Sequence, residues 1–492
     1  MKTSSKLPQK INLLILAGFT LLVLALFLFL SMKNYGIGFP LDDAWIHQTY
    51  ARNLATRGEW SFIVGKPTAG STSPLWTGLI SVGYLIKLNI FFWTFFIGGL
   101  CLFLLGYFGE RVFRVLNKNA LVNLPLMGVI LVGEWHFIWA AVSGMETILM
   151  SVLVGIFFYL ILRDSIPWFW AGFLIGIGVW VRPDAITLLG PLGFMAITRS
   201  FAEPRKISVV LSSIIGFLFP FFLYLLFNQR LQGTWWPNTF YAKQMEYQSL
   251  LETPILYRFF NLLKQPCVGV GALLVPGFIY RIWQAIHTRE WSVISMAIWW
   301  IGFNMLYAAR LPVVYQHARY LIPSMVAFFL IAGSGCSALL EKMKTEIFPS
   351  RIIKQAWIAG IAAVWLVFIG MGANAYSMDV AIIESEMVTT SKWIRDNTNP
   401  EDVIAAHDIG ALGYFGNRDI LDLAGLISPE VIPFIRDEAM LEKFIFSNDA
   451  SYLMTFPGWY PKITENLEAV FKTNSDYSPR AGGENMAVFR IP

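Results

Sequence analysis

The chain has 492 residues and a net charge of +5, and 56% of its residues are hydrophobic, 16% aromatic and 14% charged. Soluble domains carry about a quarter of charged residues, so this composition excludes a soluble protein and predicts one that crosses a membrane several times. The three cysteines, Cys101, Cys267 and Cys336, lie in apolar runs without the spacing of a zinc site or a disulfide framework, which favours small buried side chains.

The first long apolar run covers residues 11–31. It has about 20 residues, more than the core of a signal peptide, and no small-residue cleavage site follows it. We interpret it as an uncleaved first spanning helix with its N-terminus in the cytoplasm. Two helical segments come next, the amphipathic residues 42–57 and the short apolar residues 75–86, and both are predicted to lie at the membrane surface.

Ten further spans are predicted, which gives about eleven transmembrane helices in the cytoplasmic membrane. If residues 75–86 lie at the interface, Arg111, Arg114 and Lys118 fall on the cytoplasmic side, as the positive-inside rule requires. The same count places the C-terminus outside the cytoplasm. The ten spans are residues 90–108, 121–141, 147–162, 168–181, 185–197, 207–227, 267–283, 291–309, 320–340 and 352–372.

The composition changes after residue 372, where charged residues, Pro, Asn and Asp return. About 120 residues suffice for a small α/β domain. We therefore predict a membrane domain over residues 1–372 and an extracytoplasmic α/β domain over residues 373–492. Its predicted elements are a helix at 380–396 and strands at 403–406, 420–423, 452–455, 469–472 and 487–491.

The loop between the first two spans, residues 38–77, contains two adjacent acids, Asp42 and Asp43. One acid is explained as a cap of the helix that follows, where the helix dipole favours negative charge. Two acids exceed what a cap needs, and a carboxylate at this interface is suited to accept a proton from a hydroxyl group. Later in the loop, Ser71 and Ser73 either form a plain turn and helix cap or supply hydroxyls to a sugar or phosphate.

Cations recur in the predicted outer loops. Such cations most often contact lipid headgroups, but they also suit the phosphate of a lipid-linked substrate, which Arg binds with two parallel hydrogen bonds. Arg182 lies at a hairpin tip beside Asp184, and the two form either a local salt bridge or part of a site. The other candidate cations are His47, Arg52, Lys66, Lys243, His317 and Arg319.

Three other groups of polar residues need an interpretation. Glu146 is either a helix N-terminal acid or a site residue. Asn238 and Tyr241 lie in the longest outer loop between spans, where an aromatic belt explains the tyrosine and stacking on a sugar ring is the alternative. Glu134 and His136 lie inside the third predicted span, where ionisable groups usually face a cavity or each other.

Seven motifs, in chain order, resemble those of GT-C glycosyltransferases, and together they extend over most of the chain. As a series they are more specific for the superfamily than for the sugar. The chain looks most similar to the mycobacterial terminal arabinofuranosyltransferases, and more distantly to protein O-mannosyl and lipid A aminoarabinose transferases. The motifs are Leu-Asp-Asp-Ala (41–44), Thr-Ser-Pro-Leu-Trp-Thr (72–77), Gly-Met-Glu-Thr (144–147), Arg-Pro-Asp (182–184), Pro-Asn-Thr-Phe-Tyr-Ala-Lys (237–243), His-Ala-Arg-Tyr-Leu-Ile-Pro (317–323) and Asp-Ile-Gly-Ala-Leu-Gly-Tyr (408–414).

The resemblance implies an inverting sugar transfer outside the cytoplasm. The donor is a sugar on a polyprenyl phosphate held among membrane lipids, the acceptor is a cell-envelope glycan, lipid or protein, and no nucleic acid is involved. Asp42 or Asp43 would act as the base, and some members hold a divalent metal at such acids. Arg182, Lys243, His317 and Arg319 would stabilise the charge of the leaving phosphate.

The resemblance also suggests that the C-terminal domain engages the acceptor, although a structural role is the simpler reading of His407, Asp408 and Asp422. Two other function classes stay open. A flippase or transporter for a lipid-linked sugar would show paired halves with broken helices, and the sequence has no such symmetry. A membrane receptor that binds glycan without catalysis is the second alternative.

Overall fold

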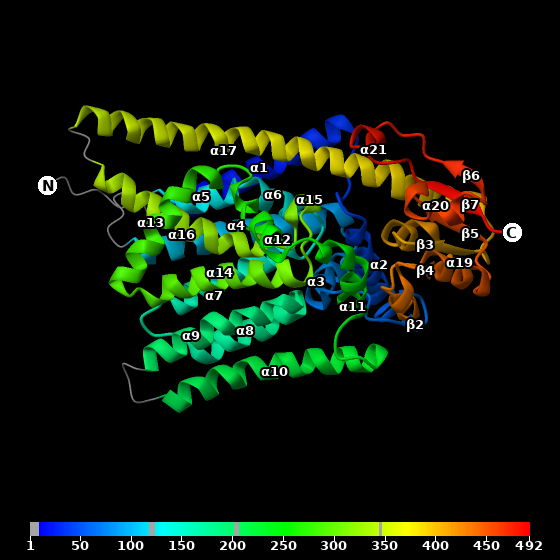
Figure 1. Ribbon diagram of the computed structural model, residues 1–492, viewed down its shortest axis with the longest axis horizontal. Helices are drawn as coiled ribbons and strands as arrows, with labels where there is room; N and C mark the ends of the chain where they lie inside the picture. The colour runs from blue at the N-terminus through cyan, green and yellow to red at the C-terminus, as the bar shows by residue number, and fades with distance from the viewer. Residues whose placement is uncertain (1–8, 118–123, 201–205, 344–346) are drawn as a thin grey trace.

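The computed structural model describes residues 9–117, 124–200, 206–343 and 347–492. Its helices run side by side along the long axis of the molecule (Figure 1). The beginning of α1 (Gln9–Asn34) lies at one end of this bundle, and a small sheet built from the C-terminal residues lies at the other (Figure 1). The predicted fold class, a helical membrane protein with a small C-terminal α/β domain, is confirmed.

In the part of the chain that the structure describes, six helices are long and apolar enough to cross a membrane, or seven if a bent pair counts as one span. The bent pair joins α12 (Ile255–Leu263) and η3 (Gln265–Cys267) to α13 (Gly271–Thr288) at an angle of 108°. The six are α1, α4 (Ile90–Leu116), α10 (Lys206–Gln232), α14 (Trp291–Arg310), α16 (Ile322–Lys342) and the helix that begins with α17 (Phe348–Ile383).

The other predicted spans correspond to shorter or broken helices. α7 (Thr147–Ile161) and α8 (Trp168–Val181) have 15 and 14 residues, and η1 (Pro183–Leu188) leads into α9 (Leu189–Ser200). The third predicted span is divided into α5 (Leu126–Val132) and α6 (Trp135–Val142). The division occurs because the Glu134 carboxylate accepts the N–H groups of His136 and Phe137 and so starts a new helix. The predicted start of that span, residue 121, and Lys118 lie outside the described residues.

The last predicted span and the helix predicted at 380–396 form one continuous helix. α17 passes through a π-helical turn, η4 (Glu384–Val388), into α18 (Thr389–Asn397). No proline or glycine interrupts residues 373–397, so nothing in the sequence stops the helix there. The predicted division after residue 372 therefore falls inside α17, and that division stays a prediction.

The C-terminal sheet has five strands in the order β4-β3-β5-β7-β6. β3 (Val403–Ala406) is parallel to β4 (Asp419–Asp422) and β5 (Tyr452–Thr455), and β7 (Ala487–Arg490) is antiparallel to β5 and β6 (Glu468–Lys472). These are the five predicted strands, displaced by one residue at most. The connecting helices are η5 (Leu412–Gly416), η6 (Pro429–Phe434), α19 (Glu438–Ser447), η7 (Pro457–Trp459), α20 (Pro461–Thr464) and α21 (Tyr477–Arg480).

A layer of short elements lies between the bundle and the sheet (Figure 1). It contains α2 (Asp42–Arg57) and α3 (Pro74–Leu85), close to the two predicted interfacial helices, and a hairpin of β1 (Ser61–Ile63) and β2 (Lys66–Pro67). α11 (Asn238–Glu246) and η2 (Gln248–Glu252) complete the layer. Ten of the 16 residues of α2 are buried, and Trp45 packs against Phe415 of the C-terminal domain with ring centroids 4.7 Å apart. α2 is therefore held between the two domains.

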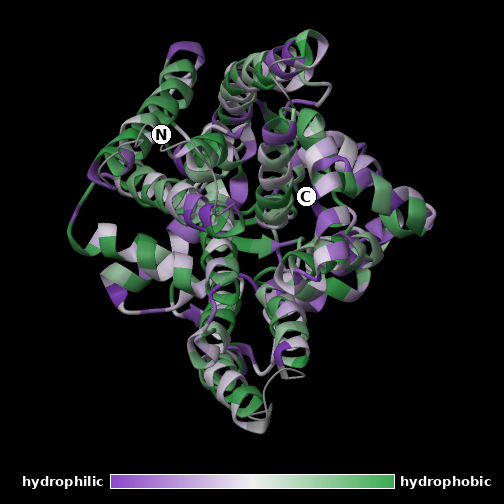
Figure 2. Ribbon diagram, turned by 90° about the vertical axis from the view of Figure 1, so that its left-hand side faces the viewer, coloured by the Kyte–Doolittle hydropathy of each residue, from purple (hydrophilic) through white to green (hydrophobic). Residues whose placement is uncertain are grey.

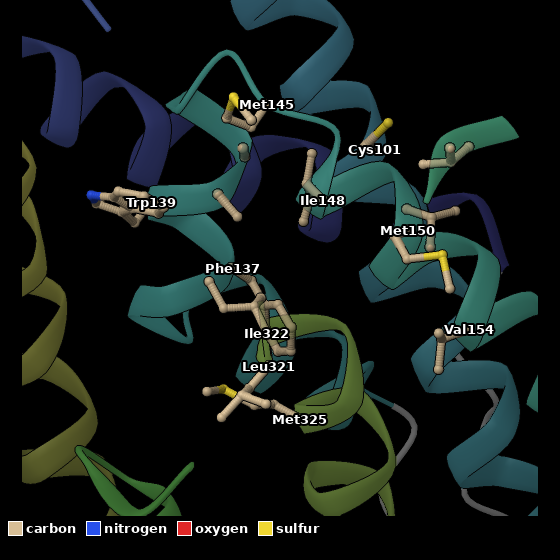
Figure 3. Packing of buried hydrophobic residues seen from close by; sticks show 14 of the residues in the cluster. Cys101, Phe137, Trp139, Met145, Ile148, Met150, Val154, Leu321, Ile322 and Met325 are labelled. Atoms are coloured by element: carbon tan, nitrogen blue, oxygen red, sulfur yellow. The ribbon is translucent and has the colours of Figure 1, made fainter. Parts of the chain in front are cut away.

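The core of the bundle centres on α16, in which 14 of 21 residues are buried. Figure 3 shows part of this core, with Phe137 of α6 beside Ile322 and Met325 at the start of α16. Hydrophobic residues also cover the outward sides of the helices (Figure 2), among them Leu21 of α1 and Phe219 of α10. Such an apolar outer surface is expected where helices contact lipid.

Candidate functional site

A cavity of about 380 Å³ opens at the end of the bundle that faces the C-terminal domain. Its wall brings together the start of α7, the turn before α9, α11, the end of α14 and the residues before α16. The charged residues that line it are Glu146, Arg182, Asp184, Lys243, Arg310 and Arg319. All but Arg310 are among the predicted site residues, and these five come from four separate segments of the chain.

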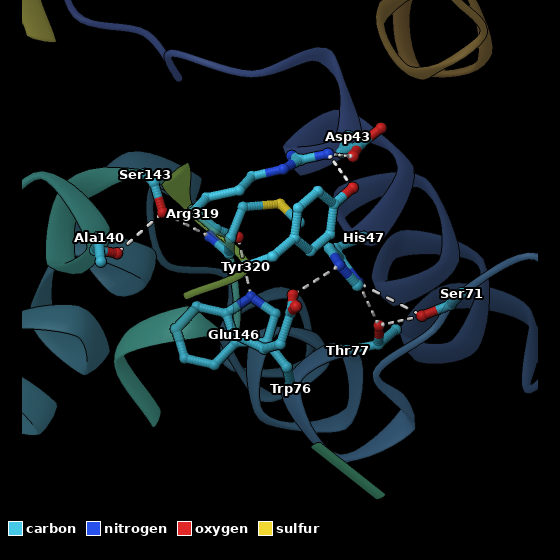
Figure 4. Close-up of polar contacts among 12 residues, drawn as sticks. Asp43, His47, Ser71, Trp76, Thr77, Ala140, Ser143, Glu146, Arg319 and Tyr320 are labelled. Carbon is cyan, nitrogen blue, oxygen red and sulfur yellow. Dashed lines mark hydrogen bonds and ion pairs between the residues drawn. The ribbon is translucent and has the colours of Figure 1, made fainter. Parts of the chain in front are cut away.

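Asp43 forms ion pairs with two of the cations that line this cavity. Its Oδ2 accepts a hydrogen bond from Arg319 Nη2 at 2.5 Å (Figure 4). The same oxygen lies 3.6 Å from Lys243 Nζ. Burial disfavours the charge on Asp43, but Arg319 and Lys243 outweigh it and hold the pKa of this carboxyl well below its usual range. Asp43 is thus an ionised carboxylate at the edge of a cationic cavity.

Tyr320, which sequence reasoning did not single out, connects the same cations. Its hydroxyl accepts hydrogen bonds from Lys243 Nζ and Arg319 Nη2, both at 3.0 Å. The guanidinium of Arg182 lies 5.7 Å from the centre of its ring. Burial opposes ionisation of the hydroxyl, yet the charges of Arg319 and Lys243 lower its pKa. The signal available in the sequence was its position directly after the candidate Arg319.

Arg319 retains N–H groups that no protein atom uses. The residue is 6% exposed, and its Nε and Nη1 have no hydrogen-bond partner among the described residues. A buried guanidinium with unused donors is costly unless a ligand or water satisfies it. Because Arg319 lines the cavity, these donors suit an anionic ligand there.

Arg182 forms the predicted salt bridge with Asp184. Two hydrogen bonds join them, from Nη2 at 2.6 Å and from Nε at 3.2 Å, and the Tyr307 hydroxyl also accepts from Arg182 Nη2 at 2.8 Å. This pairing fixes the guanidinium at the cavity wall. Arg182 and Asp184 therefore form a salt bridge and also line the cavity, so the two interpretations of this pair do not exclude each other.

A second polar chain leads from α2 to Glu146. The Nε2 of His47 lies 3.4 Å from Glu146 Oε2, and its Nδ1 lies 2.9 Å from Thr77 Oγ1 and 3.3 Å from Ser71 Oγ (Figure 4). Burial raises the pKa of Glu146, but the hydrogen bond from His47 and its charge outweigh that and lower it. Polar contacts therefore connect Ser71 and His47 to Glu146 at the cavity wall.

Asp42 faces away from the cavity and binds the C-terminal domain. Its carboxylate accepts the backbone N–H of Gly410 at 2.6 Å and that of Ala411 at 2.8 Å, and it makes no side-chain cap to its own helix. Burial and the neighbouring Asp408 raise the pKa of Asp42. The two adjacent acids therefore lie in opposite environments, with Asp43 beside cations and Asp42 beside amides and another acid.

Four further predicted site residues do not line the cavity either. The Asn238 amide donates to the carbonyl of Leu426 at 3.3 Å, and Tyr241 is exposed. Ser73 is fully buried, and His317 contacts Asp379 of α17. Their predicted roles stay predictions.

The remaining candidates do not line the cavity and pair elsewhere. Glu134 and His136 pair with each other at 2.8 Å, and Arg52 donates to the carbonyls of Gly413 and Tyr414. Lys66 pairs with Asp419 at an exposed position. In the C-terminal domain, His407 contacts Tyr460 and Glu246, and Asp422 accepts the backbone N–H groups of residues 424, 427 and 428.

The residues at the acidic pair do not fit a divalent metal ion. Both oxygens of Asp42 accept backbone N–H groups, and Asp43 lies against Arg319 and Lys243, whose charges repel a cation. Among the described residues, no group of three or more His, Cys, Asp or Glu side chains is arranged to hold a metal. A metal at Asp42 and Asp43 is implied only by the resemblance to family members that hold one, and no step below uses it.

Comparison with known proteins agrees with this architecture. Residues 378–489 match a family model described as a domain of unknown function (DUF8728), and no curated protein matches the sequence. ArnT from Cupriavidus metallidurans bound to undecaprenyl phosphate has a similar structure, with a TM-score of 0.58 and 13% identity over 96% of this chain and 97% of that chain. The apo form of ArnT gives a TM-score of 0.54 at 13% identity over 96% of both chains.

The oligosaccharyltransferase of Archaeoglobus fulgidus in its apo form has a TM-score of 0.54 and 11% identity over 91% of this chain and 70% of that chain. The same archaeal enzyme, AglB, in complex with an inhibitory peptide and a dolichol-phosphate gives a TM-score of 0.50 at 11% identity, covering 89% of this chain and 69% of that one. The chain therefore has the GT-C fold of these membrane transferases.

Proposed function

We propose that this protein is an inverting glycosyltransferase that moves a sugar from a polyprenyl phosphate to a cell-envelope glycan, lipid or protein at the extracytoplasmic face of the cytoplasmic membrane. The supporting observation is a cavity lined by Arg182, Lys243 and Arg319, of which Lys243 and Arg319 form ion pairs with the ionised carboxylate of Asp43. A transfer from a lipid phosphate needs both features, a base for the acceptor and positive charge for the leaving group.

In this reaction the bond between the anomeric carbon and the phosphate oxygen breaks. The pair of electrons leaves with the polyprenyl phosphate, whose charge Arg319, Lys243 and Arg182 stabilise. The acceptor hydroxyl attacks the anomeric carbon from the opposite side and gives its proton to Asp43, so the configuration inverts. No carboxylic acid has to protonate the leaving group because a phosphate carries the charge itself.

Asp43 is the base in this proposal, and Asp42 is a positioning residue. Both oxygens of Asp42 already accept N–H groups from the C-terminal domain, whereas Asp43 points toward the cations that line the cavity. When a phosphate takes over part of the interactions of Arg319 and Lys243, Asp43 loses stabilisation of its charge and becomes a stronger base. Binding of the donor would therefore activate the base.

The structural neighbours support a lipid-linked donor. ArnT was crystallised with undecaprenyl phosphate, and AglB was determined with a dolichol-phosphate and an inhibitory peptide. The resemblance of the motifs to arabinofuranosyltransferases makes a polyprenyl-phosphate arabinofuranose the first donor to test. A hexose on the same lipid is the second.

The test uses the full chain in lipid nanodiscs with synthetic polyprenyl-phosphate pentoses and hexoses, and mass spectrometry of candidate acceptors. We expect transfer by the wild type, loss of transfer in Asp43→Asn, and normal transfer in the control Asp396→Asn, which changes an exposed acid on α18. Donor binding without transfer to any acceptor would instead support a receptor. Movement of the labelled donor across proteoliposomes without transfer would support a flippase.

A further inference from the structure

The three residues before Arg319 adopt a conformation that side chains rarely occupy. Gln316, His317 and Ala318 have φ angles of 53°, 56° and 52°, and Arg319 returns to φ −48°. In this left-handed region the Cβ atom crowds the backbone, so non-glycine residues occur there singly and not in runs. These residues form α15 (Tyr315–Ala318), directly before the two side chains that contact Asp43 and Lys243.

Strained backbone of this kind persists only where surrounding contacts hold it. Here the contacts come from His317, whose Nε2 lies 2.8 Å from Asp379 Oδ2 on α17. The same carboxylate oxygen accepts a hydrogen bond from Trp139 Nε1 at 2.9 Å. The imidazole ring stands edge-on to Trp135 and Trp139, with ring centroids 5.2 Å and 5.1 Å away.

We propose that the His317–Asp379 pair is a positioning device that fixes the Arg319 guanidinium in the donor cavity. The left-handed turn sends His317 toward α17 and sends Arg319, two residues later, toward Asp43 on α2. His317 is not among the residues that line the cavity, so it acts through Arg319 and not on a ligand. This inference rests on the proposed function only in that the anion bound by Arg319 is a lipid phosphate.

The pair also connects the cavity to the C-terminal domain. Asp379 lies four residues before the end of α17, which continues through η4 and α18 into the sheet. The same domain binds Asp42, the neighbour of Asp43, through Gly410 and Ala411. The segments that carry Arg319 and Asp43 therefore both contact the same C-terminal part of the chain. These contacts hold the two side chains in a fixed relative position.

A double-mutant cycle on the full chain tests the proposal, with the dissociation constant of undecaprenyl phosphate as the measurement. We expect His317→Asn to weaken binding about tenfold and Arg319→Gln to weaken it at least as much. In the Arg319→Gln background, His317→Asn should change the affinity less than twofold, because the residue through which it acts is gone. If the increase in dissociation constant of the double variant equals the product of the two single increases, the two residues act independently and the proposal is overturned.

Two further measurements keep the test decisive. His287→Asn, a matched change of an exposed histidine on α13, should leave the affinity unchanged. If His317→Asn does not fold, Asp379→Asn replaces it in the same cycle, with the same expected coupling. A lower melting temperature with unchanged affinity per folded molecule would show a structural role only and would also refute the proposal.

Different results would contradict the proposed function and the positioning role of His317. It fails if the wild type does not bind undecaprenyl phosphate, or if Arg319→Gln binds it as tightly as the wild type does. The positioning role fails, with the proposed function intact, if Arg319→Gln weakens binding and His317→Asn has no effect.

Discussion

Asp43 and Arg319 are 276 positions apart in the sequence, and their side chains form an ion pair with an O–N distance of 2.5 Å. The pair joins the first turn of α2 to the turn before α16. It brings the proposed base next to the proposed phosphate ligand. In the proposed reaction, the charge of Arg319 would therefore influence both the basicity of Asp43 and the stability of the leaving group.

Arg319→Gln should change the rate and its pH dependence together. Loss of one donor to the developing phosphate charge should lower kcat about 10²- to 10³-fold. Arg319 and Lys243 lower the pKa of Asp43, so removal of Arg319 raises it. Because Asp43 must be ionised to accept a proton, the acid limb of kcat/KM should move to higher pH. Arg480→Gln, a change of an exposed arginine on α21 that does not line the cavity, is the control, and an unmoved acid limb in Arg319→Gln would contradict the role of Asp43.

Asp408→Asn should stabilise the protein more at pH 8 than at pH 5. Burial and Asp408 raise the pKa of Asp42 above its unfolded value, so the folded state loses stability as pH rises through the raised pKa. Removal of the Asp408 charge lowers the pKa of Asp42 and recovers part of that loss, about 1 kcal/mol. Asp408 Oδ2 has no hydrogen-bond partner among the described residues, so the amide breaks no bond there. Melting temperatures at both pH values provide the measurement, and an equal shift at both would disprove the coupling.

Local patterns in the sequence predicted the elements, because hydrophobic periodicity and turn residues act over a few positions. The five C-terminal strands are examples. The break at Glu134 was not predicted, since a capping carboxylate inside an apolar run is indistinguishable from a buried ion pair until its hydrogen bonds are seen. The topology predicted from the sequence placed Asp43 and Arg319 on the same side of the membrane. Only the tertiary structure shows that their side chains are in contact.

The different environments of Asp42 and Asp43 also could not be predicted from the sequence. Adjacent residues on a helix point in directions about 100° apart, so the pattern shows that the two acids face different neighbours but not which neighbours. The partner of Asp42 is 368 positions away at Gly410. Likewise, the left-handed turn at residues 316–318 has no glycine to signal it, because it is imposed by contacts with α6 and α17.

Chelation should leave the activity intact. The oxygens of Asp42 are occupied by N–H groups and Asp43 lies between two cations, so neither is free to bind a divalent ion. We expect the transfer rate in EDTA to lie within twofold of the rate in Mg²⁺ or Mn²⁺. The assay is the nanodisc transfer reaction with each additive after exhaustive dialysis against EDTA. Loss of activity that a divalent ion restores would show that this protein needs a metal, as some members of the resembled family do.

Gly410→Ala should disrupt the contact between the C-terminal domain and Asp42 of α2. A Cβ atom at residue 410 would lie 2.0 Å from the carbonyl oxygen of Asp42, so the close approach that lets the Asp42 carboxylate accept two N–H groups requires glycine. Loss of both hydrogen bonds leaves a buried carboxylate unsatisfied, at a cost of about 1–3 kcal/mol for each bond. We expect a lower melting temperature and a lower kcat, because α2 also carries Asp43. Gly302→Ala on α14, where an added Cβ meets no atom within 4 Å, is the matched control. A Gly410→Ala variant with wild-type stability and rate would show that this docking contact does not hold the catalytic loop in place.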